Sequence, residues 1–309
     1  MRLPPLKTLP VFEAVARLGS FTRAAQALHV SQSAVSHSIA QLEAWLGESL
    51  FERRGRQIAL TEQGSVYYEQ ISAALIGIQR AGDQLRGEAG SQLRLAVYSS
   101  FAVCWLIPRL PLWRQEYSQI DLDLEMLSAQ PRMSDRLADC YIAINPRQPG
   151  YESQRLYSER LFPVCSRRYW QHMQEVLGSC APPESLEPAQ LQSFALLSAT
   201  IIFAKRGEDW RRWFHAGGAG LPGSTRVQHF SHMLLAHEAA RYHQGIALSN
   251  DYMFDPADPD LIRLPCHSIA TGDEFHFACK LSRRDEPAMV RLRRWLQRQA
   301  QASGLLHSS

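Results

Sequence analysis

The sequence predicts an α/β protein in which a small, mainly helical module precedes a long helix and a larger region of alternating strands and helices. Two short amphipathic helical patterns and a glycine-containing hairpin pattern fall within the first 61 residues. A seam of apolar residues follows, and strand-like apolar runs then alternate with helical patterns, as in parallel α/β sheets. With 309 residues, the chain exceeds one usual domain and suits this division.

The stretch from Gly19 to Leu46 predicts two helices joined by a tight turn. Ser20 and Ser31 stand where helix N-caps belong. An amphipathic helix from Leu9 to Ala16 would cover the back of the pair. Residues at helical spacing give each of the two helices one apolar face: Phe21, Ala24, Ala25 and Leu28 in the first, and Val35, Ile39, Leu42 and Leu46 in the second.

The opposite face of the second helix carries small or hydrogen-bonding side chains and no acid. Such a face can enter a DNA major groove without charge repulsion and offer donors and acceptors to base edges, as a helix-turn-helix does. An ordinary helical hairpin with a solvated polar side is the alternative. The candidate DNA-contacting residues of the two helices are Arg23, Ser31, Gln32, Ser33, Ser36, His37 and Gln41.

The run from Leu50 to Leu60 predicts two short strands around a basic turn, which is a wing. Its arginines, Arg53, Arg54 and Arg56, would meet phosphates or a minor groove. A solvated hairpin tip is the alternative for these side chains. Through Thr61 the chain carries seven lysines and arginines against four glutamates, so the module is modestly basic.

A long helix is expected from Thr61, which stands at an N-cap position with Glu62 at the positive helix end. Its apolar seam lasts just under three heptads, enough for a helix that packs against a second copy of the chain. Alternatively, the seam packs only on its own winged module. Residues 87–91, GEAGS, read as a hinge, and the candidate dimerisation residues are Tyr67, Ile71, Ala74, Ile78 and Leu85.

From residue 92 onward, strand and helix patterns alternate twice. In the first round we expect strands at Leu93–Val97, Ile120–Leu127 and Tyr141–Ile144, with helices at Phe101–Tyr117 and Pro131–Ala138. The alternation restarts after Leu161–Cys165, in a second round of strands and helices: Phe194–Leu197, Trp210–Phe214, Arg226–Phe230, His232–Tyr242 and Gly245–Leu248. The chain then crosses back near Leu261–Leu264, followed by a last strand at Phe275–Lys280 and a helix at Pro287–Gln301. This predicts two parallel α/β lobes.

Ligands of such sheets bind beyond the carboxyl ends of the strands, near helix amino termini. The residues at these positions are rich in hydroxyl groups and include no carboxylate, which favours a small anionic effector such as an amino or carboxylic acid. Alternatively, each serine only caps its helix. The candidate effector-binding residues are Ser99, Ser100, Phe101, Ser128, Gln130, Asn145, Ser198, Phe230 and Ser231.

Several other functional classes find little support in the sequence. No apolar run is long enough to span a bilayer and no signal peptide is evident, so we expect a cytoplasmic protein with no membrane partner. The six cysteines are scattered without metal-ligand spacing and read as reduced thiols, with redox sensing as the alternative. Neither a metal site nor a cofactor is expected.

An enzyme is not expected either. Residues 218–223 have the glycine spacing of a phosphate loop, but Ser224 replaces the required lysine. The histidines at 229, 232, 237 and 243 should fall on different faces, and no nucleophile elbow or pair of catalytic carboxylates is present. We therefore assign no catalytic residues.

The run FTRAAQALHVSQSAVSHSIAQLEAWLGESLFERRGRQIALTEQG closely resembles the amino-terminal domain of LysR-type transcriptional regulators. The resemblance implies a winged helix-turn-helix in 1–61, a dimerisation helix and hinge in 62–90, and a two-lobed, periplasmic-binding-protein-like effector domain in 91–309. Lobe 1 would span about 91–164 and 265–309, and lobe 2 about 165–264. The implied protein is a sequence-specific regulator that binds double-stranded DNA as a homodimer or homotetramer, responds to a small molecule between its lobes, and contacts RNA polymerase.

Shorter motifs place the resemblance in the branch with activators of glycine cleavage and D-serine degradation and regulators of β-lactamase. They are Arg2–Leu6, Cys104–Leu110, Leu161–Ser166, Asp209-Trp210 and Phe230-Ser231. The third strand departs from the branch pattern, reading Tyr141-Ile142-Ala143-Ile144 where D-x-A-I is usual. We therefore do not carry over a relative's effector.

Two alternative functions stay open at this point. One is a solute-binding or sensor module whose amino-terminal helices only contact other proteins, and the other is a LysR-type regulator that needs no small molecule. Salt-dependent affinity for DNA separates the first from a DNA-binding regulator.

Overall fold

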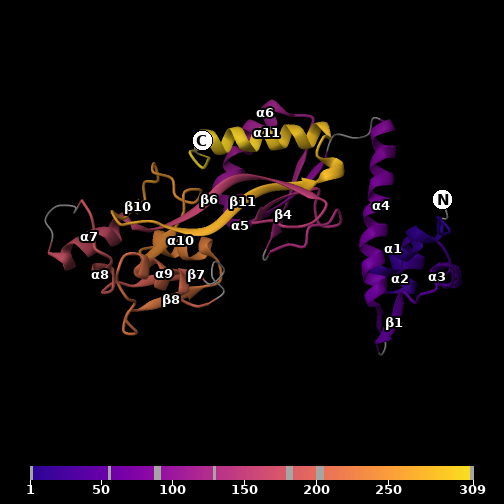
Figure 1. The fold of residues 1–309 in the computed structure, drawn as a ribbon, viewed down its shortest axis with the longest axis horizontal. Helices are drawn as coiled ribbons and strands as arrows, with labels where there is room; N and C mark the ends of the chain where they lie inside the picture. Colours follow the sequence, from indigo (N-terminus) through magenta and orange to yellow (C-terminus); the bar gives the residue numbers. More distant parts are fainter. Residues whose placement is uncertain are drawn as a thin grey trace. The chain divides into compact units, whose positions relative to one another are not determined.

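The computed structural model describes residues 3–54, 57–86, 92–127, 130–178, 184–199 and 205–306. They form two compact units (Figure 1). Unit 1 contains Met1–Gln92 together with Arg132–Asp139, and unit 2 contains Leu93–Pro131 together with Cys140–Ser309. None of the described helices is both long and apolar enough to cross a membrane.

Unit 1 has the expected winged helix-turn-helix architecture, with three short helices gathered at one end of a long one (Figure 1). Phe12, Val15 and Val35 are fully buried at its centre, on the faces that helical spacing predicts. Its elements are α1 (Thr8–Leu18), α2 (Phe21–Ala27), α3 (Gln32–Leu46), the antiparallel hairpin of β1 (Phe51–Arg54) and β2 (Gln57–Leu60), and α4 (Glu62–Arg86).

The three expected N-caps of this unit are confirmed. Ser20 Oγ accepts from the Arg23 N–H at 3.3 Å, and Ser31 Oγ accepts from the Ala34 N–H at 3.2 Å. At the start of α4, Thr61 Oγ1 accepts from the Gly64 N–H at 2.9 Å. Gly64 must be glycine, because a Cβ there would lie 2.0 Å from the carbonyl oxygen of Leu50. The caps fix where each helix begins and thus which face of α3 points outward.

Unit 2 is built on a nine-stranded sheet of the described residues, in the order β4-β3-β5-β11-β6-β9-β7-β8 with β10 paired to β6. The expected lobe pattern is present, but the sheet is mixed rather than parallel, because β6 and β11 run antiparallel to each other. Its strands are β3 (Leu93–Tyr98), β4 (Leu122–Leu127), β5 (Cys140–Ile144), β6 (Tyr151–Ser166), β7 (Leu196–Ala199), β8 (Val227–Phe230), β9 (Ile246–Ser249), β10 (Leu261–Arg263) and β11 (Ile269–Lys280).

The helices of unit 2 cover both halves of this sheet, with α6 and α11 over one half and α7 to α10 around the other (Figure 1). They are α5 (Ser99–Phe101), the π-helix η1 (Ala102–Leu106), the 3-10 helix η2 (Ile107–Arg109), α6 (Leu110–Glu116), α7 (Arg167–Leu177), α8 (Pro188–Leu191), α9 (Glu208–Ala216), α10 (Met233–Arg241), the 3-10 helix η3 (Leu281–Arg283) and α11 (Pro287–Ala302).

Two helix predictions after residue 92 need correction, one in unit 2 and one in a segment that belongs almost entirely to unit 1. The continuous helix expected over 101–117 is split into four pieces, because Pro108 lacks the N–H that an α-helical turn requires and the Ile107 N–H instead reaches back to the Ala102 carbonyl. The helix expected at Pro131–Ala138 is wrong. Only one turn forms there, in which the N–H groups of residues 137 and 138 donate to the Ser134 carbonyl.

The strands β6 and β11 run through both halves of the sheet, and their pairing slips where the halves meet. Ser158 is paired with Glu274 and Arg160 with Ala270, so Thr271, Gly272 and Asp273 bulge out opposite a single residue, Glu159. Gly272 has a φ of +86°, a conformation that favours glycine. The bulge turns Thr271 and Asp273 toward Glu159.

Candidate functional site

The outward face of α3 is exposed as the sequence predicts. Gln32, Ser33, Ser36, His37 and Gln41 are all exposed, whereas Val35, Ile39 and Leu42 on the other face are buried. Arg23 on α2 and the N-cap Ser31 are exposed as well. The helix therefore presents a row of hydrogen-bonding groups without an acid on the exposed face of unit 1.

Hydrogen bonds hold the start of this face in place. Thr22 Oγ1 donates to Gln32 Oε1 at 3.3 Å, and the hydroxyl oxygens of Ser31 and Ser33 lie 2.9 Å apart. The one acid of α3, Glu43, accepts from the backbone N–H groups of residues 50 and 51. Its charge thus ties α3 to the hairpin and leaves the outward face neutral.

The wing is present as the β1–β2 hairpin, with Arg54 paired in register with Gln57. Arg53 and Arg54 lie on β1, but their side chains fall outside the described part of the structure, as does all of Arg56. Phosphate contact by these three arginines stays a prediction from their place in the hairpin.

The five candidate dimerisation residues of α4 divide into two groups. Tyr67 and Ile71 pack against the core of unit 1, where the Tyr67 ring lies 5.5 Å from that of Phe12. Ala74 and Ile78 are exposed, Ile78 by 69%, and the side chain of Leu85 lies outside the described part. The first half of the seam thus serves its own module, and the second half offers an apolar surface.

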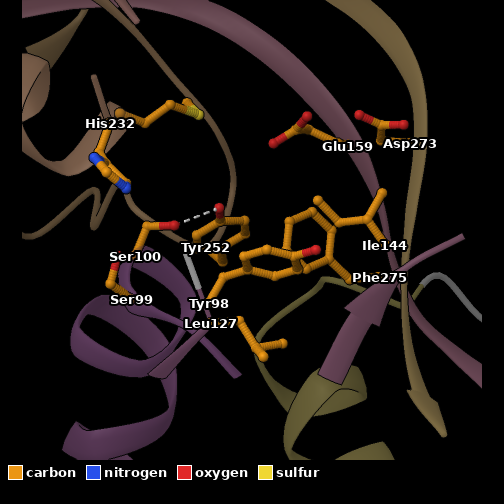
Figure 2. A pocket seen from close by; sticks show the side chains of 11 residues that line it. Tyr98, Ser99, Ser100, Leu127, Ile144, Glu159, His232, Tyr252, Asp273 and Phe275 are labelled. Carbon is orange, nitrogen blue, oxygen red and sulfur yellow. Dashed lines mark hydrogen bonds between the residues drawn. The ribbon is translucent and has the colours of Figure 1, made fainter. Parts of the chain in front are cut away.

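Unit 2 encloses a cavity of about 80 Å³ where the two halves of its sheet meet, a volume that holds several water molecules. Figure 2 shows its lining: carboxyl groups at one end, serines and a histidine at the other, and aromatic rings between them. The lining residues are Tyr98, Ser99, Ser100, Leu127, Ile144, Glu159, His232, Met233, Tyr252, Asp273 and Phe275.

The aromatic part of the lining is rigid. The Tyr252 ring lies 5.3 Å from that of Phe275, and Phe275 is stacked on Phe101 at 5.5 Å in a layer behind it. Tyr98 is fixed by its hydroxyl, which donates to Gln130 Oε1 at 2.9 Å. Burial raises the pKa of Tyr98 to about 12, so this hydroxyl stays protonated at neutral pH.

The carboxyl end consists of Glu159 on β6 and Asp273 on the β11 bulge. Both Glu159 oxygens accept hydrogen bonds, from Asn250 Nδ2 at 2.9 Å and from Thr271 Oγ1 at 3.1 Å. Asp273 Oδ1 accepts from Asn145 Nδ2 at 3.0 Å. These donors are neutral, and within the described residues neither carboxyl group forms an ion pair with a lysine or arginine.

Burial makes this arrangement electrostatically unfavourable. It raises the pKa of Glu159 to about 7, with the nearby Asp273 charge adding to the effect and the two hydrogen bonds opposing it. Burial likewise raises the pKa of Asp273. Ionisation of either carboxyl group therefore creates a charge that has no counter-ion among the described residues.

The nine sequence-predicted effector residues are only partly at this cavity. Ser99 and Ser100 line it, and Ser100 Oγ lies 3.1 Å from the Tyr252 hydroxyl. Phe101 backs the aromatic layer, while Gln130 and Asn145 hold Tyr98 and Asp273 in place. Ser128 lies outside the described residues.

The three second-lobe predictions do not line the cavity. Ser198 is fully buried, donates to Asp209 Oδ1 at 2.7 Å and accepts from the Gly207 N–H. These bonds hold Gly207 and Asp209 at the start of α9, as the capping alternative allowed. Phe230 packs against the second-lobe core, and Ser231 hydrogen-bonds the His232 ring.

The sequence-based argument that the ligand site contains no carboxylate is wrong for this cavity. Glu159 and Asp273 come from the two strands that cross between the halves, which sequence periodicity did not single out. Gly272 was the available signal, because a glycine within a strand indicates a bulge, but the strand expected from the sequence began only at Phe275. No comparable signal pointed to Glu159.

The remaining titratable side chains suggest no metal or disulfide chemistry. No group of three potential metal ligands occurs among the described residues. No disulfide joins the described cysteines, which are Cys104, Cys140, Cys165, Cys266 and Cys279, and Cys180 lies outside that part.

Comparisons with known proteins match both units. The family described as "Bacterial regulatory helix-turn-helix protein, lysR family" matches residues 6–65, and the "LysR substrate binding domain" matches residues 86–301. The glycine cleavage system transcriptional activator of Escherichia coli strain K12 is 33% identical over 309 residues, which covers 97% of this chain and 95% of that protein. The transcriptional activator AmpR of Rhodobacter capsulatus is 30% identical over 300 residues, with 96% and 97% covered. The solved structure of ArgP from Mycobacterium tuberculosis shares the fold over 100% of both chains, with a TM-score of 0.68 and 21% identity.

Proposed function

The chain belongs to the LysR family of bacterial helix-turn-helix regulators, and on that premise we propose that α3 reads operator DNA while a small molecule in the unit 2 cavity sets the protein's activity. The family membership makes it a DNA-binding transcriptional regulator with an effector-binding domain. The observation that carries the assignment of roles is the exposed, acid-free face of α3.

In this proposal, Gln32, Ser33, Ser36 and His37 contact base edges, with Gln41 further along the same face. Arg23 and the wing arginines hold phosphates and set the register without reading sequence. The proposed boundaries are 1–61 for DNA binding, 62–90 for the dimerisation helix and hinge, and 91–309 for the effector domain. Within α4, the exposed Ala74 and Ile78 support a homodimer or homotetramer interface on the second half of the seam.

The effector proposed from the sequence is an amino or carboxylic acid. The cavity volume of about 80 Å³ suits a small molecule, and Ser99 and Ser100 present hydroxyl groups to it. The protein would act in the cytoplasm, where the chromosome lies, contact RNA polymerase at its target promoters, and catalyse no reaction.

Footprinting tests the DNA-binding role directly. The purified full-length protein is titrated onto the DNA upstream of its own gene and onto a shuffled fragment of equal length, over a series of salt concentrations. We expect a defined protected segment on the first fragment only, with affinity falling steeply as salt rises. Equal binding to both fragments, or none at low salt, would favour the sensor module that acts through protein contacts.

A further inference from the structure

The unit 2 cavity contains an acidic end whose charge no lysine or arginine of the described residues balances. Glu159 is 5% exposed, and its carboxyl group faces the cavity beside that of Asp273 (Figure 2). The nearest described cation on β6, Arg160, is engaged with Asp251. The neighbouring chain outside the described residues, 128–129 and 200–204, contains no charged residue in its sequence. A positively charged group on a ligand would therefore meet carboxyl groups that the described side chains leave without a counter-ion.

Aromatic rings complete the surroundings of this acidic end. Tyr98, Tyr252 and Phe275 line the cavity between its two ends, and both tyrosine hydroxyls are engaged in hydrogen bonds. Ring faces attract cations, and they do so most strongly where water is excluded. An organic cation thus finds two kinds of favourable contact here, whereas an anion meets two carboxyl groups.

We propose that the cavity binds its ligand through an ammonium group, which lies between the carboxyl groups of Glu159 and Asp273 and the neighbouring aromatic rings. The inference rests on the proposed function, because it names the chemical class of the effector. The bulge opposite Glu159 is the element that builds this subsite, since it brings Asp273 from β11 to the same end of the cavity.

The opposite end of the cavity suits a carboxylate. Ser99 and Ser100 present hydroxyl groups there, and His232 lies beside them (Figure 2). None of the three carries a negative charge at neutral pH. A small α-amino acid therefore satisfies both ends, a simple amine only the acidic end, and a simple carboxylic acid only the hydroxyl end.

Calorimetry on the full-length protein tests the inference with matched compounds. Each small amino acid is compared with its deaminated acid and its decarboxylated amine, for example alanine with propionate and ethylamine. We expect at least one amine-bearing compound to bind, its deaminated acid to bind about tenfold more weakly or worse, and Glu159→Gln to lose about tenfold in affinity for it. Glu274→Gln, on the neighbouring strand β11 but outside the cavity and paired with Arg155, should change the affinity less than about threefold.

A second readout separates a direct charge contact from a structural effect. Bound ammonium favours the ionised carboxyl group, so binding at pH 7 should release part of a proton from Glu159, seen as a dependence of the measured heat on the buffer. Glu159→Gln should abolish most of that release, and Glu274→Gln should preserve it.

Three outcomes would overturn the inference. In the first, a carboxylic acid without an amino group binds as tightly as its amino acid. In the second, Glu159→Gln binds the amine with unchanged affinity. In the third, no amine-bearing compound binds at millimolar concentration. An acid that binds and alters the footprint would leave the proposed function standing while refuting the ammonium subsite. A footprint that no compound alters would instead count against a small-molecule effector.

Discussion

The recognition face of α3 and the acidic end of the unit 2 cavity handle polar groups in opposite ways. The side chains on this face of α3 are exposed and include no acid, and the one acid of the helix accepts hydrogen bonds from backbone N–H groups next to the hairpin. Glu159 is buried and Asp273 is half-buried, and neither carboxyl group has a counter-ion among the described residues. The α3 face can contact DNA without charge repulsion. The acidic end of the cavity is unfavourable when ionised, and a cationic ligand would stabilise it.

The largest effect is expected from a negative charge introduced on the recognition face of α3. Ser33→Glu places a negative charge where phosphates and base edges approach, and like-charge contacts cost several kcal/mol. We expect at least about a 100-fold loss of operator affinity in footprinting, with unchanged circular dichroism. Ser65→Glu, an equally exposed position on α4, is the matched control and should bind normally. A folded Ser33→Glu protein that still finds its operator would contradict the assignment of α3.

Removing the buried charge should stabilise unit 2. Burial raises the pKa of Glu159 from 4.5 in the unfolded chain to about 7 in the folded protein. As the pH rises from 4.5 to 7, the unfolded chain loses this proton before the folded protein does, so stability falls over that range. Glu159→Gln should therefore gain roughly 1–3 kcal/mol at pH 8 and little at pH 4.5. Tryptophan fluorescence during denaturation measures the unfolding of unit 2, because six of the seven tryptophans belong to it.

Glu274→Gln is the control for that measurement, because it should change stability at pH 8 in the opposite direction. Hydrogen bonding to Arg155 lowers the pKa of Glu274, so the mutation should slightly lower stability at pH 8. A stability gain of equal size in both variants, or a gain for Glu159→Gln that does not depend on pH, would show that Glu159 is not held at a raised pKa.

A smaller effect separates serines that hold loops from serines that meet the ligand. Ser198→Ala leaves the buried Gly207 N–H and Asp209 short of a partner, which should cost about 1–3 kcal/mol of stability without changing ligand affinity. Ser249→Ala is the matched control, because that buried hydroxyl has no partner among the described residues and its loss should be neutral. A loss of ligand affinity in Ser198→Ala would place Ser198 in the site after all.

The smallest expected effect concerns the wing. Arg53→Ala should weaken binding a few-fold and about equally on operator and shuffled DNA, and reduce the slope of log affinity against log salt by about 1. Arg298→Ala, in unit 2 and paired with Glu116, should leave both quantities unchanged. A change in sequence preference in Arg53→Ala would mean that the wing reads bases.

The sequence was informative wherever a structure depends on neighbouring residues. The three N-caps, the buried stripe of α3 and its outward face follow from helical spacing within single short segments. Ser99 and Ser100 were found for a similar reason, since they directly follow a buried strand. Local propensity failed at Pro131–Ala138, where a short helical pattern yields only a turn.

The acidic end of the cavity could not be found in this way. Glu159 and Asp273 lie more than a hundred residues apart in sequence and meet only because β11 slips in register against β6. Hydrophobic periodicity gives the faces of a strand but not its pairing partner, so the bulge was invisible to it. Ser198 shows the converse error, because a strand-end serine can be satisfied entirely within its own lobe.

The most direct test of the account joins the two regions in one footprint. The amine-bearing compound selected by calorimetry is added to the wild-type protein and to Glu159→Gln on the same operator fragment. We predict that the compound shifts or shortens the protection of the wild-type protein, and that Glu159→Gln protects the operator but no longer responds. An undiminished response in Glu159→Gln, or an equal wild-type response to the deaminated acid, would contradict control of DNA binding through an ammonium group in the cavity.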